Sequence, residues 1–354
     1  MTNNKRITYL DMARGMGMIL VVMGHVEYMN MTLLQYIYAF HMPLFFLISG
    51  ILIWEKREEE KNFIALAKNK LRSIMLPYAV FSVLSLLIES ARLLIKNLDE
   101  WNLIGRQIFQ TLCLQGVSTL WFLPALFMSE LLFIGIRKRL GHGGTVGATG
   151  IIMLLSAMLS IWEKNWYSQH MESSACGLVH DVLSMLPRNL FCAGFVCMGY
   201  YVGKVLLPGL TKAWQEAVVG FLFAVLAVAV ISQNGIVELR YMSFSNLLLY
   251  LLGAVAGTMV VLCICRLLER LPRKILKAPL IYFGRNSLII MVTHMEFRVL
   301  YCSIRLAALI NSVWSNQVMF CVIVVLLVFL IEIPIIWVFN QILPKILGKA
   351  TKNS

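Results

Sequence analysis

The chain has 354 residues; 59% of them are apolar or aromatic and only 14% are charged, against roughly 25% charged in an ordinary soluble domain. Its formal net charge is +13, yet the basic residues stand in short clusters between long apolar runs. A nucleic-acid-binding protein instead gathers them on one soluble surface. This composition excludes a soluble enzyme, a disordered chain and a nucleic-acid binder, and it predicts an all-α polytopic membrane protein.

Apolar stretches long enough to cross a membrane follow one another along the chain, and a span needs about 20 such residues. Ten stretches qualify: Met12–Tyr28, Tyr36–Trp54, Ser73–Ile95, Leu120–Ile136, Thr145–Trp162, Leu190–Leu207, Trp214–Ser232, Ser245–Leu267, Leu280–Tyr301 and Gln317–Leu343. The connections between them are too short for a soluble domain, so we expect residues 1–354 to form a single membrane-embedded domain. The first stretch contains an Arg and a His and lacks a small-residue cleavage site, which favours a retained helix over a signal peptide.

The distribution of basic residues predicts how these spans are oriented. With ten spans both termini lie on the same side, and 23 of the 31 Lys and Arg residues then share that side. The remaining eight lie on the opposite side: Arg92, Lys96, Arg106, Lys164, Arg188, Arg240, Arg298 and Arg305. Because cytoplasmic loops carry the excess of Lys and Arg, both termini are predicted to be cytoplasmic.

The connection Glu55–Arg72 differs from the others. It is highly charged, but Phe63, Leu66, Ala67 and Leu71 recur in it at helical spacing. This pattern predicts a short helix lying at the cytoplasmic interface, and a solvated connector is the alternative.

The eight cysteines show no paired spacing typical of a zinc site, so we expect no metal site. Most of them fall inside predicted spans, where a thiol serves as a soft packing group. Cys113 and Cys176 both fall in predicted outer loops and could form a disulfide.

The first span carries three ionisable residues, Asp11, Arg14 and His25. Arg14 and His25 are 11 residues apart, or about three helical turns, and Asp11 lies about one turn before Arg14, so all three are predicted on one face. A charged group at the centre of a membrane helix costs about 2.5–3.5 kcal/mol on insertion scales, which makes such groups functional candidates.

Each of these residue types suits a distinct role. A neutral imidazole can accept a proton from a hydroxyl near neutral pH, so His25 is a candidate general base. Arg14 is a permanent cation suited to an anionic or carbonyl-bearing ligand, or to pairing with Asp11. The alternatives are a hydrogen-bonded structural histidine and an ion pair that only anchors the helix.

Two aromatic segments add candidate binding residues. Residues 40–50 read FHMPLFFLISG, in which His41 begins an apolar aromatic stripe, and Trp121 stands in an interfacial LWFL motif. His294 lies near the middle of the predicted ninth span. Simple packing is the alternative for His41.

A second group of candidates is suited to binding phosphate. Lys70 and Arg72 belong to a basic run before Pro77, and Arg285 and Asn286 open the predicted ninth span. Arg and Lys bind phosphate oxygens, while Asn286 or Ser287 could cap the helix that follows, whose free backbone N–H groups could hold an anion. The alternative for the basic run is orientation and contact with lipid headgroups.

These motifs occur together in one known family. They are the Asp-x-x-Arg pattern followed by a His after ten residues, the FHMPLFFLISG segment, the basic run before Pro-Tyr, LWFL, and GRNSL with a later His. From Tyr9 to about His294 the sequence resembles the acyltransferase-3 family of bacterial integral-membrane acyltransferases.

The resemblance implies transfer of an acyl group, commonly acetyl from acetyl-CoA, to a hydroxyl of a cell-surface glycan or a lipid-linked sugar at the bacterial cell membrane. It implies that His25 and Arg14 are the essential residues. Where the family often has two arginines three residues apart before Pro-Tyr, this chain has Asn69 and Arg72. Lys68 or Lys70 could replace the missing arginine, although an ammonium group lacks the bidentate geometry of a guanidinium group.

The leading hypothesis is therefore an acyltransferase with no permanently bound cofactor, in which acyl-CoA is the donor and His25 the general base. Because no serine or cysteine nucleophile with a paired base is evident, the sequence favours direct transfer over an acyl-enzyme. The alternative is a transporter or flippase for a polar or lipid-linked solute that uses the stripe of Asp11, Arg14 and His25 as its pathway.

Overall fold

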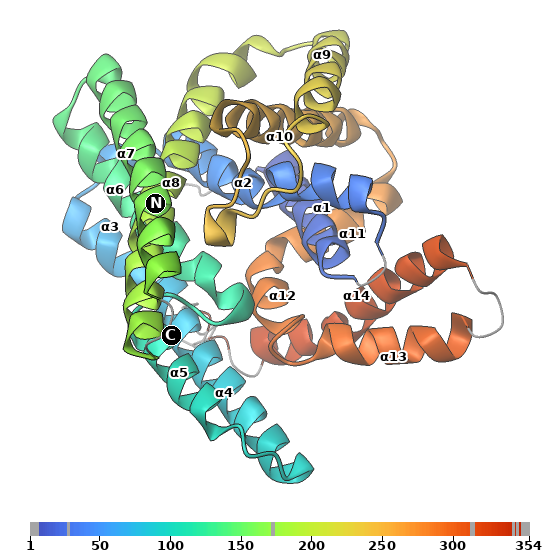
Figure 1. Cartoon of the computed structure of the whole chain (residues 1–354). Helices are drawn as coiled ribbons and strands as arrows, with labels where there is room; N and C mark the ends of the chain where they lie inside the picture. The colour runs from blue at the N-terminus through green and yellow to red at the C-terminus, as the bar shows by residue number, and fades with distance from the viewer. Residues whose placement is uncertain are drawn as a thin grey trace.

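The protein is described here from a computed structural model, which covers residues 7–26, 29–170, 174–311 and 316–341, together with residues 344 and 347. Throughout these ranges its regular elements are helical (Figure 1). The α-helices are α1 (Thr8–Gly24), α2 (Met31–Glu55), α3 (Phe63–Lys70), α4 (Leu76–Lys96), α5 (Trp101–Leu112), α6 (Phe122–Arg139), α7 (His142–Gln169), α8 (Ser174–Tyr201), α9 (Ala213–Ile231), α10 (Leu247–Arg270), α11 (Lys274–Arg285), α12 (Ser287–Thr293), α13 (Val299–Asn311) and α14 (Gln317–Gln341).

Within the described residues, eight helical segments are long and apolar enough to cross a membrane, so the all-helical polytopic architecture is confirmed. Each corresponds to one of the ten predicted spans; the predicted first and ninth spans are absent from the eight. Helix α1 is short, at 17 residues, and ends at Gly24. The predicted ends at Tyr28 and Leu343, like both chain termini, lie outside the described residues.

The prediction of one continuous ninth span, Leu280–Tyr301, is wrong. Helix α11 ends at Arg285, α12 ends at Thr293, and α13 begins only at Val299. The turn between α12 and α13 contains Arg298 in a left-handed conformation, with φ of 57°. Hydropathy alone cannot show this break, because the apolar residues on either side of the turn still average to a span.

The helix predicted in the connection Glu55–Arg72 exists as α3, whereas its place at the cytoplasmic interface stays a prediction. It does not stand apart, because a π-helical turn, Leu71–Met75, joins α3 to α4. Residues 63–96 therefore form a single helical segment of 34 residues. Helix α5 was not predicted from the sequence; it is short, amphipathic and exposed on much of its surface.

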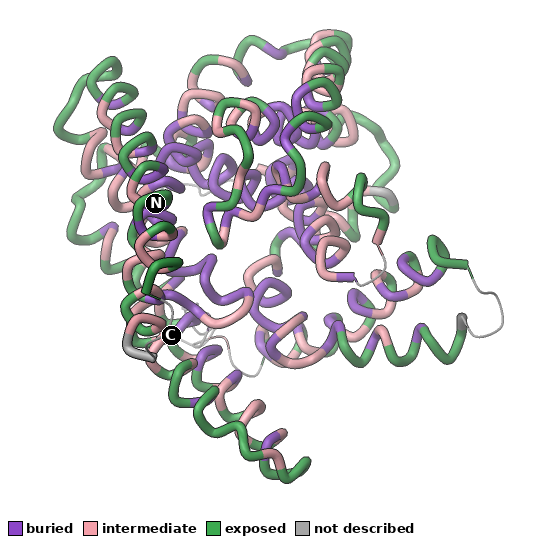
Figure 2. Tube along the Cα trace, in the orientation of Figure 1, coloured by how far each residue is buried: buried purple, intermediate pink, exposed green. Residues whose placement is uncertain are grey.

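Burial divides the helices into an inner and an outer group. Figure 2 shows buried residues concentrated in the middle of the molecule, on α1, α2, α8 and α10. On α14, Val318, Val322, Leu326 and Leu330 are all exposed and recur every four residues. An apolar stripe with this spacing lies on one helix face, and on a polytopic membrane protein we expect it to contact lipid.

Glycines bring two pairs of inner helices into backbone contact. A Cβ atom added to Gly284 would lie 1.7 Å from the carbonyl oxygen of Asp11, and one added to Gly15 would lie 2.1 Å from that of Leu280. Helices α1 and α11 therefore cross where only glycine fits. Gly50 and Gly199 make the same kind of crossing between α2 and α8.

The disulfide that Cys113 and Cys176 could have formed is absent. Both residues are described, and both have free thiols.

Candidate active site

His25 is the first residue after α1, and its ring orientation is fixed by the helix that precedes it. The Nδ1 atom lies 2.8 Å from the carbonyl oxygen of Val21. Because a carbonyl oxygen can only accept, Nδ1 carries the proton and donates. The neutral ring therefore keeps the lone pair of Nε2, the atom a general base would use.

Two further histidines repeat this geometry. His41 and His294 are buried, and their Nδ1 atoms lie 2.8 Å and 2.7 Å from the carbonyl oxygens of Ile37 and Ile290. The His294 ring packs edge-to-face against His25, with 5.4 Å between centroids. The fold thus brings together three histidines that the sequence analysis selected separately, each with the same tautomer.

Two chambers meet at His25. The first, here called the aromatic chamber, has a volume of about 210 Å³ and includes His25, His41, Tyr38 and Trp121 in its wall. The second, here called the polar chamber, has a volume of about 370 Å³. Its lining is His25, Ser85, Glu89, Gln107, Val117, Ser118, Met295, Glu296, Arg298, Leu300, Tyr301 and Ile304.

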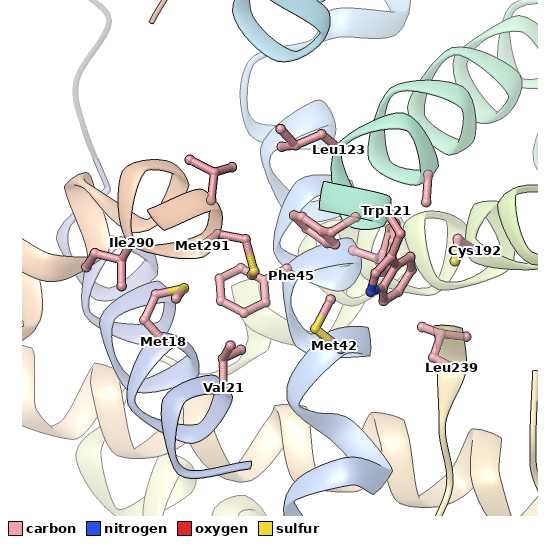
Figure 3. Close-up of a cluster of buried hydrophobic side chains, with 14 of the residues drawn as sticks. Met18, Val21, Met42, Phe45, Trp121, Leu123, Cys192, Leu239, Ile290 and Met291 are labelled. Atoms are coloured by element: carbon pink, nitrogen blue, oxygen red, sulfur yellow. The ribbon is translucent and has the colours of Figure 1, made fainter. Parts of the chain in front are cut away.

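Apolar side chains support the aromatic chamber from several helices. Figure 3 shows Val21 of α1, Met42 of α2, Met291 of α12 and the Trp121 ring in one buried cluster. Leu239, from the connection between α9 and α10, belongs to the same cluster and lines the chamber. Because most of the wall is apolar, the few polar groups of the chamber would determine which ligand binds and in which orientation.

Among those polar groups are Glu238 and Arg240, which both line the aromatic chamber from the connection between α9 and α10. Burial raises the pKa of the Glu238 carboxyl, and the nearby Arg240 guanidinium lowers it to a smaller extent. Neither residue was a site candidate from the sequence, since nothing near them in the sequence marks a site.

A strained loop separates the two chambers. Leu114, Gly116 and Ser118 all have positive φ, at 59°, 74° and 47°. A Cβ atom at Gly116 would lie 2.4 Å from backbone atoms of Trp121, so the loop folds back closely on itself. Ser118 lines both chambers. Such strain persists only where surrounding contacts hold the backbone in place.

Two buried residues of opposite charge hold this loop. Glu296 accepts hydrogen bonds from Ser85 and from the backbone N–H of Thr119, the latter at 3.3 Å. Arg188 donates to the carbonyl oxygen of Gln115 at 3.1 Å and lies over the Trp121 ring, 5.1 Å from its centroid. Neither role was predicted from the sequence, because the interacting residues are distant from each other along the chain.

The side chain of Arg188 is fully buried. It forms no ion pair with any carboxylate in the described ranges, and its Nη1 atom has no hydrogen-bond partner. Burying an unpaired cation destabilises a fold, so a cation that is retained in such a position is a functional candidate.

Asp11 and Arg14 do not pair with each other. Asp11 is buried and accepts a hydrogen bond from Nε of Arg285 at 3.0 Å, across the crossing of α1 and α11. Arg14 forms no hydrogen bond or ion pair with any residue that the structure describes, although Asp11 and Glu130 are near enough to act on it electrostatically.

The remaining predicted phosphate ligands differ in availability. Lys70 lies 2.8 Å from an oxygen of Glu58 and 2.7 Å from an oxygen of Glu130. Arg72 is exposed. The predicted capping role of Asn286 is wrong, because its side chain turns back and donates to the carbonyl oxygen of Tyr282 at 2.8 Å.

A polytopic helical protein with a half-buried histidine at the junction of two chambers, and on the same helix an arginine without a partner among the described residues, has the features expected of a membrane-embedded group-transfer enzyme. The Acyl_transf_3 family model, described as an acyltransferase domain, matches residues 7–336. The chain belongs to this family and is an integral-membrane acyltransferase. No curated protein and no solved structure gives a significant match to the chain.

Proposed function

We propose that the protein transfers an acyl group, in the simplest case acetyl, from acyl-CoA to a hydroxyl of a surface glycan or lipid-linked sugar, with His25 as the general base. The observation that carries the proposal is the position of His25. Its Nε2 lone pair is left free by the hydrogen bond from Nδ1 to Val21, and its ring belongs to the walls of both chambers. A direct transfer needs such a point, because donor carbonyl and acceptor hydroxyl must meet beside one base.

The transfer balances without an enzyme nucleophile. Nε2 of His25 accepts the hydroxyl proton while the hydroxyl oxygen forms a bond to the thioester carbonyl carbon. The carbon–sulfur bond then breaks, and the CoA thiolate takes the proton from the imidazolium. A cation or N–H group near the carbonyl oxygen would stabilise the charge that develops there.

The donor is proposed to enter from the end of α1 that carries Arg14. Arg14 is free to bind an anionic or carbonyl group of the donor, and Arg285, whose side chain is 42% exposed, faces solvent at the crossing of α1 and α11. Lys70 and Arg72 would add positive charge for the phosphates. This direction agrees with both termini in the cytoplasm and with a bacterial cell membrane, the location that the charge bias and the family favour.

The polar chamber is proposed to receive the acceptor. Its free amide at Gln107, the hydroxyl of Ser118 and the ring of Tyr301 offer the hydrogen bonds and the apolar face that a sugar uses.

The test is the variant His25→Ala, measured in purified protein with labelled acetyl-CoA and by mass spectrometry of the surface glycans of cells that carry it. We expect transfer to fall by about 10²–10⁴-fold, the usual contribution of a positioned base. His170→Ala is the matched control, because His170 is exposed and its Nδ1 also bonds to a backbone carbonyl, that of Trp166. Transfer at the wild-type rate by correctly inserted His25→Ala would exclude His25 as the base.

A further inference from the structure

Lys70 is held between two carboxylates that lie far from it in the sequence. Its Nζ atom is 2.7 Å from Oε2 of Glu130 and 2.8 Å from Oε2 of Glu58, and all three side chains are at most 13% exposed. One ammonium and two carboxylates leave the cluster with a net negative charge. Because both carboxylates are in contact with Nζ, Lys70 can bind a phosphate only if one of them leaves.

The two carboxylates are not equally fixed. Glu130 lies within α6, accepts a hydrogen bond from Lys70 and accepts a second from Ser49 of α2. Glu58 lies on a three-residue 3₁₀ turn, Glu58–Glu60, in the connection between α2 and α3.

The contacts of Glu58 are correspondingly weaker. Its Oε2 atom has no partner with hydrogen-bond geometry, although it is close to Lys70. Arg57, just before the turn, has φ of 47°, a strained conformation for a non-glycine residue. Glu58 is therefore the partner of Lys70 that can be displaced, and Glu130 is the one that stays.

The cluster is also near the predicted path of the donor. Arg14 is within electrostatic reach of Glu130, and Lys56 is within reach of Arg14, Lys70 and Glu58. Desolvation lowers the pKa of the Lys56 ammonium, Glu58 raises it, and the two neighbouring cations lower it. Removing Glu58 alone would leave three cations around one carboxylate, which is an environment suited to a phosphate.

We propose that Glu58 occupies the position on Lys70 that a phosphate of the acyl-CoA donor takes, and that Glu58 thereby sets the affinity for the donor by competing with it. This inference rests on the proposed function, since it assumes a phosphate-bearing donor. When the donor binds, a phosphate oxygen replaces the Glu58 carboxylate beside Nζ, and the 3₁₀ turn moves out. Glu130 keeps Lys70 in place during the exchange.

The test is binding of CoA and of acetyl-CoA to the full-length protein in nanodiscs at low ionic strength, measured by isothermal titration calorimetry. Glu58→Gln should bind CoA about threefold to tenfold more tightly than wild type, the range expected for one partly buried ion pair. Its KM for acetyl-CoA should fall by the same factor, while the kcat of the transfer should not increase.

Two further variants make the test specific. Glu59→Gln is the matched control, because it removes a carboxylate from the same turn that binds the hydroxyl of Tyr200, at 2.6 Å, instead of Lys70. We expect it to leave the CoA affinity unchanged. In a Lys70→Met background, Glu58→Gln should have no effect, because the competition requires Lys70.

The outcomes separate this inference from the proposed function. Equal CoA affinity of wild type and Glu58→Gln, or the same gain in the Lys70→Met background, overturns the role of Glu58 and leaves the acyltransferase proposal standing. Absence of CoA binding by every variant overturns both, because no phosphate-bearing donor would then be in use.

Discussion

The crossing of α1 and α11 gives a sharp prediction for Gly284→Ala. The added Cβ would lie 1.7 Å from the carbonyl oxygen of Asp11, whereas ordinary contacts begin at 3.4 Å. The two helices must then separate by about the difference, or 1.7 Å, because the obstacle is backbone and cannot rotate away. Overpacking of this kind costs about 1–3 kcal/mol, and a clash with backbone belongs at the upper end.

The same separation acts on the site. Arg285 follows Gly284 directly, and its Nε atom is 3.0 Å from Asp11 across the crossing. A displacement of that size breaks this hydrogen bond and leaves a buried carboxylate unpaired, which adds to the loss of stability. We therefore expect Gly284→Ala to lower both the midpoint of thermal unfolding in detergent and the rate of acyl transfer.

The matched control is Gly105→Ala in α5, where an added Cβ meets nothing within 4 Å. Alanine is favoured over glycine in a helix interior by about 0.8–1.0 kcal/mol, so this variant should be slightly more stable than wild type. The reasoning is refuted if both alanine variants shift the unfolding midpoint equally, or if Gly284→Ala retains wild-type stability.

Two further predictions concern polar groups around the chambers. Arg188→Met should leave the midpoint of thermal unfolding unchanged or raise it, because an apolar side chain replaces an unpaired buried cation. The rate of acyl transfer should fall by roughly tenfold to a hundredfold, because the loop that carries Trp121 loses its anchor. A fall in both the midpoint and the rate would contradict this prediction. Burial raises the pKa of Glu238 above 4.5, so the native state favours the protonated form and loses this stabilisation as the pH rises through the raised pKa. Thermal unfolding of Glu238→Gln should therefore match wild type at about pH 4 and exceed it at about pH 7; equal curves at both values would show that the charged form bears no penalty.

The apolar pattern was sufficient to predict the helical architecture because hydropathy is averaged over long windows. Eight of the ten predicted spans correspond to helices of spanning length. The first and the ninth predicted spans are the two exceptions, and the ninth, Leu280–Tyr301, fails because its turn is held by polar residues whose partners lie far away in the sequence. Glu296 binds Ser85, and Arg298 binds Glu89 at 2.8 Å. No local pattern reports contacts with a separation of about two hundred residues.

For the candidate site, the sequence predicts which residues are candidates but not how they are paired. His25, Arg14 and Asp11 were selected because ionisable groups are rare inside apolar runs, and this signal is local. Whether such a group is free or neutralised depends on tertiary contacts. From the sequence Lys70 was expected to be an available cation, whereas Glu58 and Glu130 neutralise it. Asp11 was a possible partner of Arg14, but Asp11 binds Arg285 instead.

The two glycine crossings limit how the protein can work. Gly15 and Gly284 bring the backbones of α1 and α11 into contact, and Gly50 and Gly199 do the same for α2 and α8. Helices in such contact cannot slide past each other without steric collision. A carrier that alternates between two open states must rock one bundle against another, whereas here both helices that carry histidines of the aromatic chamber, α1 and α2, are fixed to their neighbours. These contacts favour the proposed acyltransferase over the carrier alternative, because α1 and α2 are held against their neighbours while, in the proposed mechanism, only the acyl donor moves to His25.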